Sequence, residues 1–225
     1  MKQHTCALVL MVMAGLACGG GHVDRKAELM QDSWPAADNG MLHVASKKMT
    51  DDELSNLLDD VRVPLLREAD LHRNLLTETS ARTLIMSPKS QKLQKLGLAD
   101  NQLGDRGVTV LAGSPTLNGV THLRLSDNGA GEAAVRSLVQ SSNLGSLRTL
   151  EIGHQSLGDA SASVLVGLRP LESLLVRRAE IGGTGARTLI EASPAQSLLL
   201  QYNPIGPSGL VGLAGFSERL THLTL

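Results

Sequence analysis

The stretch Leu93-Gln-Lys-Leu96-Gly-Leu98-Ala-Asp-Asn101-Gln-Leu103-Gly-Asp-Arg-Gly107 carries the pattern that decides the fold of this chain. Leucines recur at fixed spacing, an asparagine follows them, and a glycine-bounded turn closes the unit. The frame repeats about every 27 residues early in the chain and about every 24 or 25 residues late in it, which is typical of a repeat architecture. Further copies of the frame begin upstream at Leu66, and downstream at Val120, Leu147, Leu171, Ala195 and Leu220, while a degraded copy surrounds Leu42.

Each copy predicts one short strand followed by one short helix. The Leu-x-Leu alternation places both leucines on the same, inward face of a strand. The stretches 108–111, 133–138, 162–165 and 186–190 are apolar and predict helices on the convex side. Strands of successive copies then stack in parallel, so the predicted class is an α/β solenoid. Thr50-Asp-Asp-Glu53 is a capping box, and we expect its helix to cover the first strand and shield the open end of the array.

These copies resemble the leucine-rich-repeat family, and the Leu-Gly-Asp-x-Gly turn resembles its ribonuclease-inhibitor-like subclass. The resemblance covers residues 39–225, with a degenerate first copy and an incomplete last copy. It implies a curved array of short parallel strands with helices on the convex side. It also implies a ladder of asparagine amides that bond the turn backbone, at Asn74, Asn101, Asn128 and Asn203. Gln155 and Ala179 depart from that pattern, which puts the ladder in doubt at those two positions.

The composition favours a thin and regular core. The apolar residues are nearly all Leu, Val, Ile and Ala, because the chain holds a single Trp34, a single Tyr202 and a single Phe216. Aromatic side chains bury the most area each, so a chain that lacks them needs many equivalent aliphatic contacts. The formal net charge of -1 argues against nucleic acid as a partner, since binding its backbone needs clustered excess Lys and Arg.

Residues 1–18 have the build of a secretory signal peptide, with Lys2, an apolar run and small residues near its end. The sequence around Cys18 resembles the lipobox of bacterial lipoproteins, in which the cysteine becomes the acylated mature N-terminus. We therefore predict lipidation at Cys18, a membrane attachment through that lipid and a place in the bacterial cell envelope. Plain secretion is the alternative. Residues 19–38 lack periodicity and predict a flexible tether.

Motifs for catalysis, cofactors or metals are not found in the sequence. The seven histidines fall in the leader, in the tether or in separate repeats, so no metal site is expected. The stretch Gly129-Ala-Gly131-Glu-Ala-Ala134 matches a dinucleotide-binding pattern, but it occupies the turn position of its repeat. The acidic pairs 51–52 and 59–60 are expected to be solvated charges at helix ends. We predict a protein that is not an enzyme and that takes no cofactor.

The strand register predicts which side chains line the concave face. Two apolar residues, Leu175 and Leu199, fall on the solvent side of the sheet, and Arg178 lies near them. Apolar anchors surrounded by Arg and Tyr are typical of interface hot spots. The alternative is that other parts of the chain cover these leucines. The candidate partner-binding residues are Arg124, Glu151, Leu175, Arg177, Leu199, Gln201 and Tyr202.

The sequence therefore predicts a non-catalytic interaction module that is lipid-anchored or secreted and binds another protein or a cell-envelope component through its concave sheet. One alternative is a regulator of an enzyme or GTPase built on the same repeats, and another is a degenerate array with a structural role only. Leu220, Leu223 and Leu225 form an apolar strand at the C-terminal edge. An unpaired strand edge invites association, so we expect either self-association there or a longer natural protein.

Overall fold

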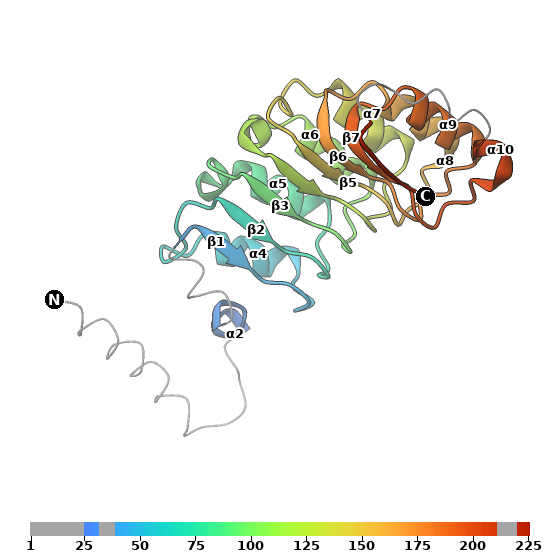
Figure 1. Ribbon diagram of the computed structural model, residues 1–225. Helices are drawn as coiled ribbons and strands as arrows, with labels where there is room; N and C mark the ends of the chain where they lie inside the picture. The colour runs from blue at the N-terminus through green and yellow to red at the C-terminus, as the bar shows by residue number, and fades with distance from the viewer. Residues whose placement is uncertain (1–24, 32–38, 211–219) are drawn as a thin grey trace.

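The computed structural model describes residues 25–31, 39–210 and 220–225, which form one curved array of strand and helix units (Figure 1). Within these residues, eight short strands make a single parallel sheet in which each strand pairs with the next one along the chain. The strands are β1 (Met41–His43), β2 (Glu68–Asp70), β3 (Lys95–Gly97), β4 (His122–Arg124), β5 (Thr149–Glu151), β6 (Leu171–Leu175), β7 (Ala195–Leu199) and β8 (His222–Thr224). The predicted fold class, a leucine-rich-repeat solenoid, is confirmed.

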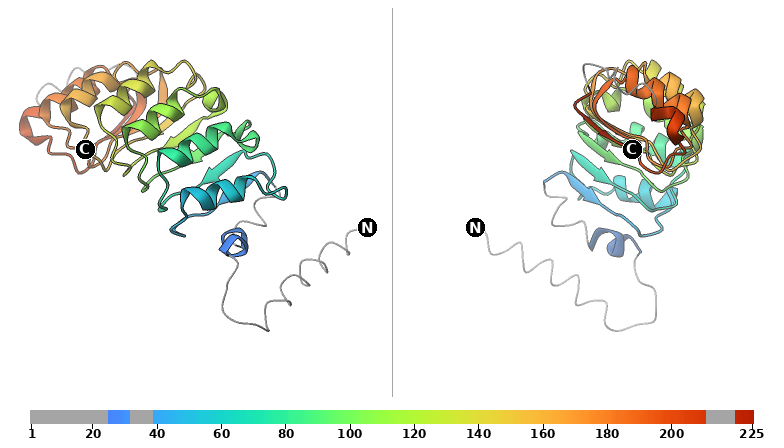
Figure 2. Two further views of the ribbon diagram at one scale, coloured as in Figure 1. Left: turned by 180° about the vertical axis from the view of Figure 1, so that it is seen from behind. Right: turned by 45° about the vertical axis from the view of Figure 1, so that its right-hand side comes forward.

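A helix on the convex side connects each strand to the next, so the sheet forms one layer and the helices another (Figure 2). The convex helices are α4 (Asp51–Leu58), α5 (Glu78–Met86), α6 (Gly104–Ala112), α7 (Glu132–Gln140), α8 (Gly158–Leu165), α9 (Gly183–Glu191) and α10 (Gly206–Leu210). Two 3-10 turns, η1 (Pro88–Ser90) and η2 (Pro115–Gly119), follow α5 and α6. The four helices predicted from the apolar stretches are thus present as α6, α7, α8 and α9.

The register of the sheet follows the repeat frame of the sequence. The inward residue before the last position of each strand pairs with its equivalent in the next strand, from Leu42 with Ala69 at one end to Leu198 with Leu223 at the other. Leu150, at the centre of β5, has 0% of its surface exposed. The inward leucines therefore stack into one continuous aliphatic core between sheet and helices, and the alternate residues are left on the concave side.

The N-terminal end of the array is covered differently from the sequence prediction. Residues 25–31, which fall within the predicted flexible tether, form helix α2 (Arg25–Gln31), whose Leu29 joins the hydrophobic core. Arg25 Nε lies 3.1 Å from Glu53 Oε1 of α4, and Lys26 Nζ lies 2.8 Å from Asp60 Oδ2. Helix α4 has the predicted capping box, formed by Thr50 and Glu53, but it takes the ordinary convex place of its own repeat. Helix α2 packs beside it at the open end.

The amide ladder extends further than the asparagines alone indicate. Asn128 Nδ2 donates to the carbonyls of Leu98 and Leu125, at 2.9 and 3.0 Å. Gln155 continues the ladder, because its Nε2 donates to Ile152 O at 2.9 Å and its Oε1 accepts from Ala130 N at 3.0 Å. The doubt about position 155 is thus removed. At position 179 the alanine offers no amide.

The backbone of Ala179 takes over part of the missing side chain's role. Its carbonyl accepts hydrogen bonds from the N–H groups of Leu157 and Gly158, at 3.2 and 3.0 Å. The doubt that the sequence raised about the side-chain ladder at this position is thus justified. Asn203 resumes the ladder in the next repeat, where its Nδ2 donates to Val176 O at 2.7 Å.

A second ladder, of aspartates, joins the helix layer and was not predicted from the sequence. Asp105 Oδ1 accepts hydrogen bonds from Gly131 N and Ala134 N at 2.7 and 3.2 Å, and so caps the first turn of α7 from the preceding repeat. Asp51 bonds the first turn of α5 in the same way, and Asp159 accepts from Gly182 N at 2.6 Å. The capping aspartate therefore recurs in every second repeat. Free N–H groups at helix starts favour such acceptors.

Candidate binding face

Three columns of outward residues run across the sheet from β1 to β8 on its concave side. The first column contains Glu68, Lys95, His122, Thr149, Ser173, Ser197 and His222. The central column contains His43, Asp70, Gly97, Arg124, Glu151, Leu175, Leu199 and Thr224. The third column continues two residues beyond the central one, with His72, Ala99, Ser126, Gly153, Arg177 and Gln201. The strand pairing has the register that the repeat frame predicts, which places the residues of the first two columns side by side.

The columns bring the predicted site residues together on neighbouring strands. Arg124, Glu151, Leu175 and Leu199 follow one another in register on β4 to β7. Arg177 and Gln201 extend the third column beside the two leucines, and Tyr202 follows in the turn after β7. The residues form one continuous surface at the C-terminal half of the concave face.

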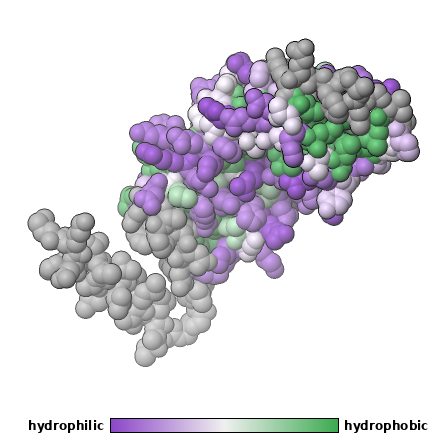
Figure 3. All heavy atoms as spheres, viewed as in Figure 1, coloured by the Kyte–Doolittle hydropathy of each residue, from purple (hydrophilic) through white to green (hydrophobic). Residues whose placement is uncertain are grey.

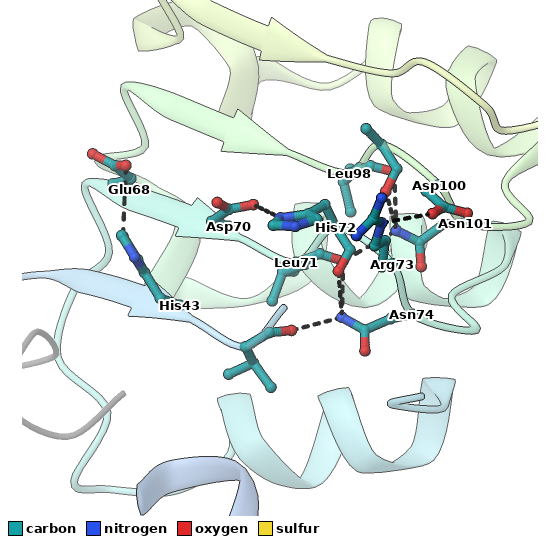
Figure 4. A network of polar contacts seen from close by, with 12 residues as sticks. His43, Glu68, Asp70, Leu71, His72, Arg73, Asn74, Leu98, Asp100 and Asn101 are labelled. Atoms are coloured by element: carbon teal, nitrogen blue, oxygen red, sulfur yellow. Dashed lines mark hydrogen bonds and ion pairs between the residues drawn. The ribbon is translucent and has the colours of Figure 1, made fainter. Parts of the chain in front are cut away.

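Over β1 to β3, the polar side chains of the concave face are paired within the chain (Figure 4). Glu68 lies between His43 Nε2 at 3.5 Å and Lys95 Nζ at 3.2 Å. Asp70 Oδ1 lies 2.8 Å from His72 Nδ1. The carboxylates on this part of the sheet therefore already have basic partners. The individual pairs were not predicted from the sequence, because the register alone does not fix side-chain conformation.

Over β6 and β7, two leucines replace the polar residues of the central column, toward the C-terminal end of the array, where apolar residues gather in Figure 3. Leu175 and Leu199 are half-buried, and neither belongs to the hydrophobic core or to the side chains that pack against it. The residues before them in the first column, Ser173 and Ser197, are short. The described residues thus leave both leucines partly open to solvent, and the predicted binding role stays a prediction.

The charged residues around the leucines have no partners in the described part of the chain. Arg124, Glu151 and Arg177 form neither an ion pair nor a side-chain hydrogen bond there. Arg124 and Glu151 lie opposite each other in register on β4 and β5. Arg177 has no such neighbour, because the equivalent position on β5 is Gly153.

Gly153 is required by the close approach of the next repeat. A Cβ atom at this position would lie 2.1 Å from Arg177 O and 2.6 Å from Arg177 N, distances that no side chain allows. The third column therefore has no side chain at position 153, where the Arg177 backbone packs against Gly153. Arg177 itself is half-buried.

The turn after each strand from β1 to β7 holds at least one non-glycine residue in the left-handed region, and the turns after β1 and β6 hold two: these residues are Ser46, Lys48, Arg73, Asp100, Asp127, His154, Arg178, Glu180 and Tyr202. At the C-terminal half, the guanidinium of Arg178 lies over the Tyr202 ring, 4.9 Å from its centroid. Tyr202 is 74% exposed, although it is the chain's single tyrosine. An exposed Tyr stacked with an Arg offers a rigid aromatic contact at the rim of the apolar surface.

Two polar atoms near this surface lack hydrogen-bond partners. Ser126 is 4% exposed, and its Oγ has no partner in the structure. Gln201 Oε1 is also buried without a partner. Buried polar groups are nearly always satisfied, so these two atoms are exceptions in the structure, and a group on the concave face can bond them only when their side chains turn outward.

An open groove of about 480 Å³ lies elsewhere, along the starts of β4 to β7. Its lining includes Arg148 and Glu172, whose side chains pair with each other at 2.6 Å. Among the described residues there is no cluster of three or more His, Cys, Asp or Glu that could hold a metal ion. Gly129, with φ of 66°, begins the turn before α7, as the repeat predicts for the dinucleotide-like stretch.

Two findings concern the membrane. Cys18, the leader and most of the predicted tether lie outside the described residues. No helix in the ranges 25–31, 39–210 and 220–225 is long and apolar enough to cross a bilayer. The predicted lipid attachment stays a prediction.

The comparisons with known proteins agree with this architecture. Residues 89–112 match the family described as Leucine Rich repeat. Among solved structures, an internalin from Listeria monocytogenes aligns with a TM-score of 0.51 and 18% identity, over 82% of this chain and 53% of that chain. This chain therefore spans about half the length of that internalin. A search of curated proteins found no match.

Two further structures align less closely. The TLR13–ssRNA13 complex has a TM-score of 0.40 and 19% identity, over 79% of this chain and 30% of that chain. The plant peptide hormone receptor RGFR1 in complex with RGF2 has a TM-score of 0.35 and 19% identity, over 82% and 36%. These two scores are too low to carry an argument. The fold is a leucine-rich-repeat solenoid, a class that typically mediates protein–protein interaction through its extended concave surface.

Proposed function

We propose that this protein is a non-catalytic binding module that recognises another protein through the C-terminal half of its concave face. One observation carries the proposal: Leu175 and Leu199 lie half-open on the solvent side of the sheet and outside the core. Arg177, Tyr202 and Gln201 surround them with groups that have no ion pair or hydrogen bond in the described residues. Interface hot spots combine apolar anchors with Tyr and Arg in this way.

The test compares a double variant with a control variant, both made in the full chain. Leu175→Asp with Leu199→Asp should abolish capture of the protein's partner from cell-envelope extract, because a carboxylate replaces the apolar anchor. Leu65→Asp is the matched control, since Leu65 is 45% exposed and lies in the loop before β2. The proposal fails if the proteins captured by the wild type and by the double variant are the same. Circular dichroism melts establish that all three proteins are folded.

We also propose that Cys18 attaches the module to a membrane of the bacterial cell envelope, with secretion as the alternative, and that the repeats are of the ribonuclease-inhibitor-like subclass. The apolar run before Cys18 and the glycines after it support the lipid anchor. Cys18→Ser should release the protein from membranes, since stable attachment depends on the acyl chains. Mass spectrometry of the wild-type protein then has to find the added lipid. A soluble wild-type protein without that mass contradicts the anchor.

A further inference from the structure

The apolar surface on β6 and β7 has the size of one side chain. Leu175 and Leu199 are direct partners in the sheet, where neighbouring strands lie about 4.8 Å apart. Ser173 and Ser197 bound the pair on one side, and Glu151 and Thr224 bound it in the neighbouring strands. Leu175 and Leu199 together can therefore seat one large apolar group, and polar contacts begin immediately around it.

The charged groups next to this apolar surface are mostly positive. Arg124, Arg177 and Arg178 lie around it together with one carboxylate, Glu151, which is in register with Arg124 but forms no ion pair in the described residues. Arg177 has no carboxylate within ion-pair distance in the described residues. Glu180, in the turn after β6, accepts a hydrogen bond from Ser156 at 2.7 Å.

Several basic side chains elsewhere along the array have acidic neighbours. Lys95 pairs with Glu68, Arg73 with Asp100, and Arg148 with Glu172. Arg82 with Glu78 and Arg136 with Glu132 form such pairs on the convex helices. Arg177, like Arg106 and Arg124, has no such partner in the described residues, and it lies beside the leucines. Charge complementarity therefore calls for a carboxylate from the partner.

The spacing at the end of β6 sets the geometry of that partner. Arg177 follows β6 by two residues, where Val176 N still bonds Leu199 O at 2.9 Å and Arg178 N bonds Gln201 O at 3.1 Å. Two residues of extended chain span roughly 6.6 Å on the same face. An extended peptide has the same repeat, so its residues i and i+2 match Leu175 and Arg177. Gln201 Oε1, in the same column as Arg177, is buried without a donor, so it can accept a hydrogen bond from a peptide N–H only when its side chain turns outward.

We propose, on the basis of the proposed function, that this surface binds an extended acidic peptide segment of the partner protein. One large apolar side chain sits on Leu175 and Leu199, and an Asp or Glu two residues away pairs with Arg177. Arg178 and Tyr202 contact the segment beyond the carboxylate. A nucleic-acid strand fits less well, because the leucines offer nothing to a phosphate and the chain's net charge is -1.

The experiment selects peptides from a random phage-displayed library on the immobilised full chain. Enriched peptides should share a large apolar residue with an Asp or Glu two positions away. A synthetic copy of one such peptide should bind Arg177→Glu about tenfold more weakly or worse than wild type. Its Kd for Arg106→Glu should stay unchanged, since Arg106 is an exposed, unpaired arginine on the convex helix α6. A peptide with Lys in place of the carboxylate should restore binding to Arg177→Glu.

The outcomes separate this proposal from the proposed function. Peptides that need Leu175 and Leu199 but carry no carboxylate, or carry Lys or Arg instead, overturn the acidic-peptide proposal and leave the binding face in place. A lack of enrichment, or peptides that bind the Leu175→Asp and Leu199→Asp variant equally well, contradicts both. Tight binding of a single-stranded RNA oligonucleotide that Arg177→Glu abolishes also overturns the proposal.

Discussion

The two halves of the concave face share one backbone and differ in how their outward side chains are satisfied. Over β1 to β3, Glu68 and Asp70 have basic partners within the chain. Over β5 to β7, two leucines meet solvent and Arg177 has no carboxylate in the described residues. Exposed ion pairs contribute little to stability, so their main effect here is to satisfy charges that a partner would otherwise bind. The comparison indicates that the N-terminal half is a closed surface and the C-terminal half an open one.

The largest expected effect on stability distinguishes a leucine in the core from a leucine on the open surface. Leu150→Asp should unfold the array, because Leu150 is fully buried and an unpaired buried carboxylate costs several kcal/mol out of a total stability of about 5–15 kcal/mol. Leu175→Asp should leave the melt nearly unchanged. Far-UV circular dichroism with urea titration measures both. If Leu175→Asp unfolds the protein as Leu150→Asp does, the two leucine columns have been assigned to the wrong faces.

The next largest effect on stability concerns the ladder of side-chain amides, which runs through both halves of the array. Asn101→Ala removes donors to Leu71 O and Leu98 O and an acceptor for Leu76 N, so we expect a loss of about 2–3 kcal/mol. In the C-terminal half, Ala179→Asn supplies the amide that this repeat lacks and should raise stability by about 1 kcal/mol. Urea midpoints of the two variants test this difference. A stabilised Asn101→Ala variant would show that the ladder is not a source of stability.

Low pH should destabilise the N-terminal end of the array before the other repeats. The hydrogen bonds from Arg62 outweigh burial and, together with Lys26, hold the pKa of Asp60 well below its ordinary value of 3.8. At Asp51, burial raises the pKa, but the hydrogen bonds from Ser80 and Thr77 outweigh it and lower the pKa. Groups with lowered folded-state pKa values stabilise the fold above their unfolded pKa. This contribution is lost as the pH falls below about 4.

Asp60→Asn tests this pH dependence. The wild type should lose about 1 kcal/mol more than the variant between about pH 6 and about pH 3, a value kept small because Arg62 and Lys26 are partly exposed. Hydrogen exchange at about pH 3 should show faster exchange in α2 and α4 than in α8 and α9. Equal losses in the two proteins would mean that Asp60 does not link folding to pH.

The repeat frame of the sequence was sufficient to predict the sheet and its two faces. The spacing of Leu96, Leu123 and Leu150 fixes strand phase, and a one-residue slip would have placed the leucines in solvent. Leu175 and Leu199 were therefore assigned to the concave side by counting alone. The ladder at position 155 was not predicted, because the longer side chain of Gln155 had to be seen to reach the same carbonyl groups.

Other features depend on contacts between distant residues. Helix α2 has no strong periodicity of its own, and it is held by Arg25 and Lys26 against residues of the first repeat. The capping aspartates at every second repeat bond backbone groups of the following repeat, which no local pattern indicates. The pairing of Glu68 with Lys95 requires particular side-chain conformations. Local sequence patterns thus determine the repeats and the sheet. Tertiary contacts determine the structure of the N-terminal end and the pairing of side chains on the surface.

The smallest expected effect on stability concerns the closed, N-terminal half of the concave face, over β1 to β3. Lys95 Nζ and Glu68 Oε2 lie 3.2 Å apart, and the lysine side chain is 52% exposed. Exposed pairs of this kind typically contribute about 0.2–1 kcal/mol, because solvent screens the attraction and two long side chains lose freedom. A double-mutant cycle with Glu68→Gln and Lys95→Met should therefore give a coupling energy below about 1 kcal/mol.

Neither variant should change the Kd of a peptide bound at Leu175 and Leu199, whereas Arg177→Glu should change that Kd and leave stability unaltered. If Lys95→Met weakens peptide binding as strongly as Arg177→Glu does, the bound segment extends over both halves, and the N-terminal pairs are part of the binding surface.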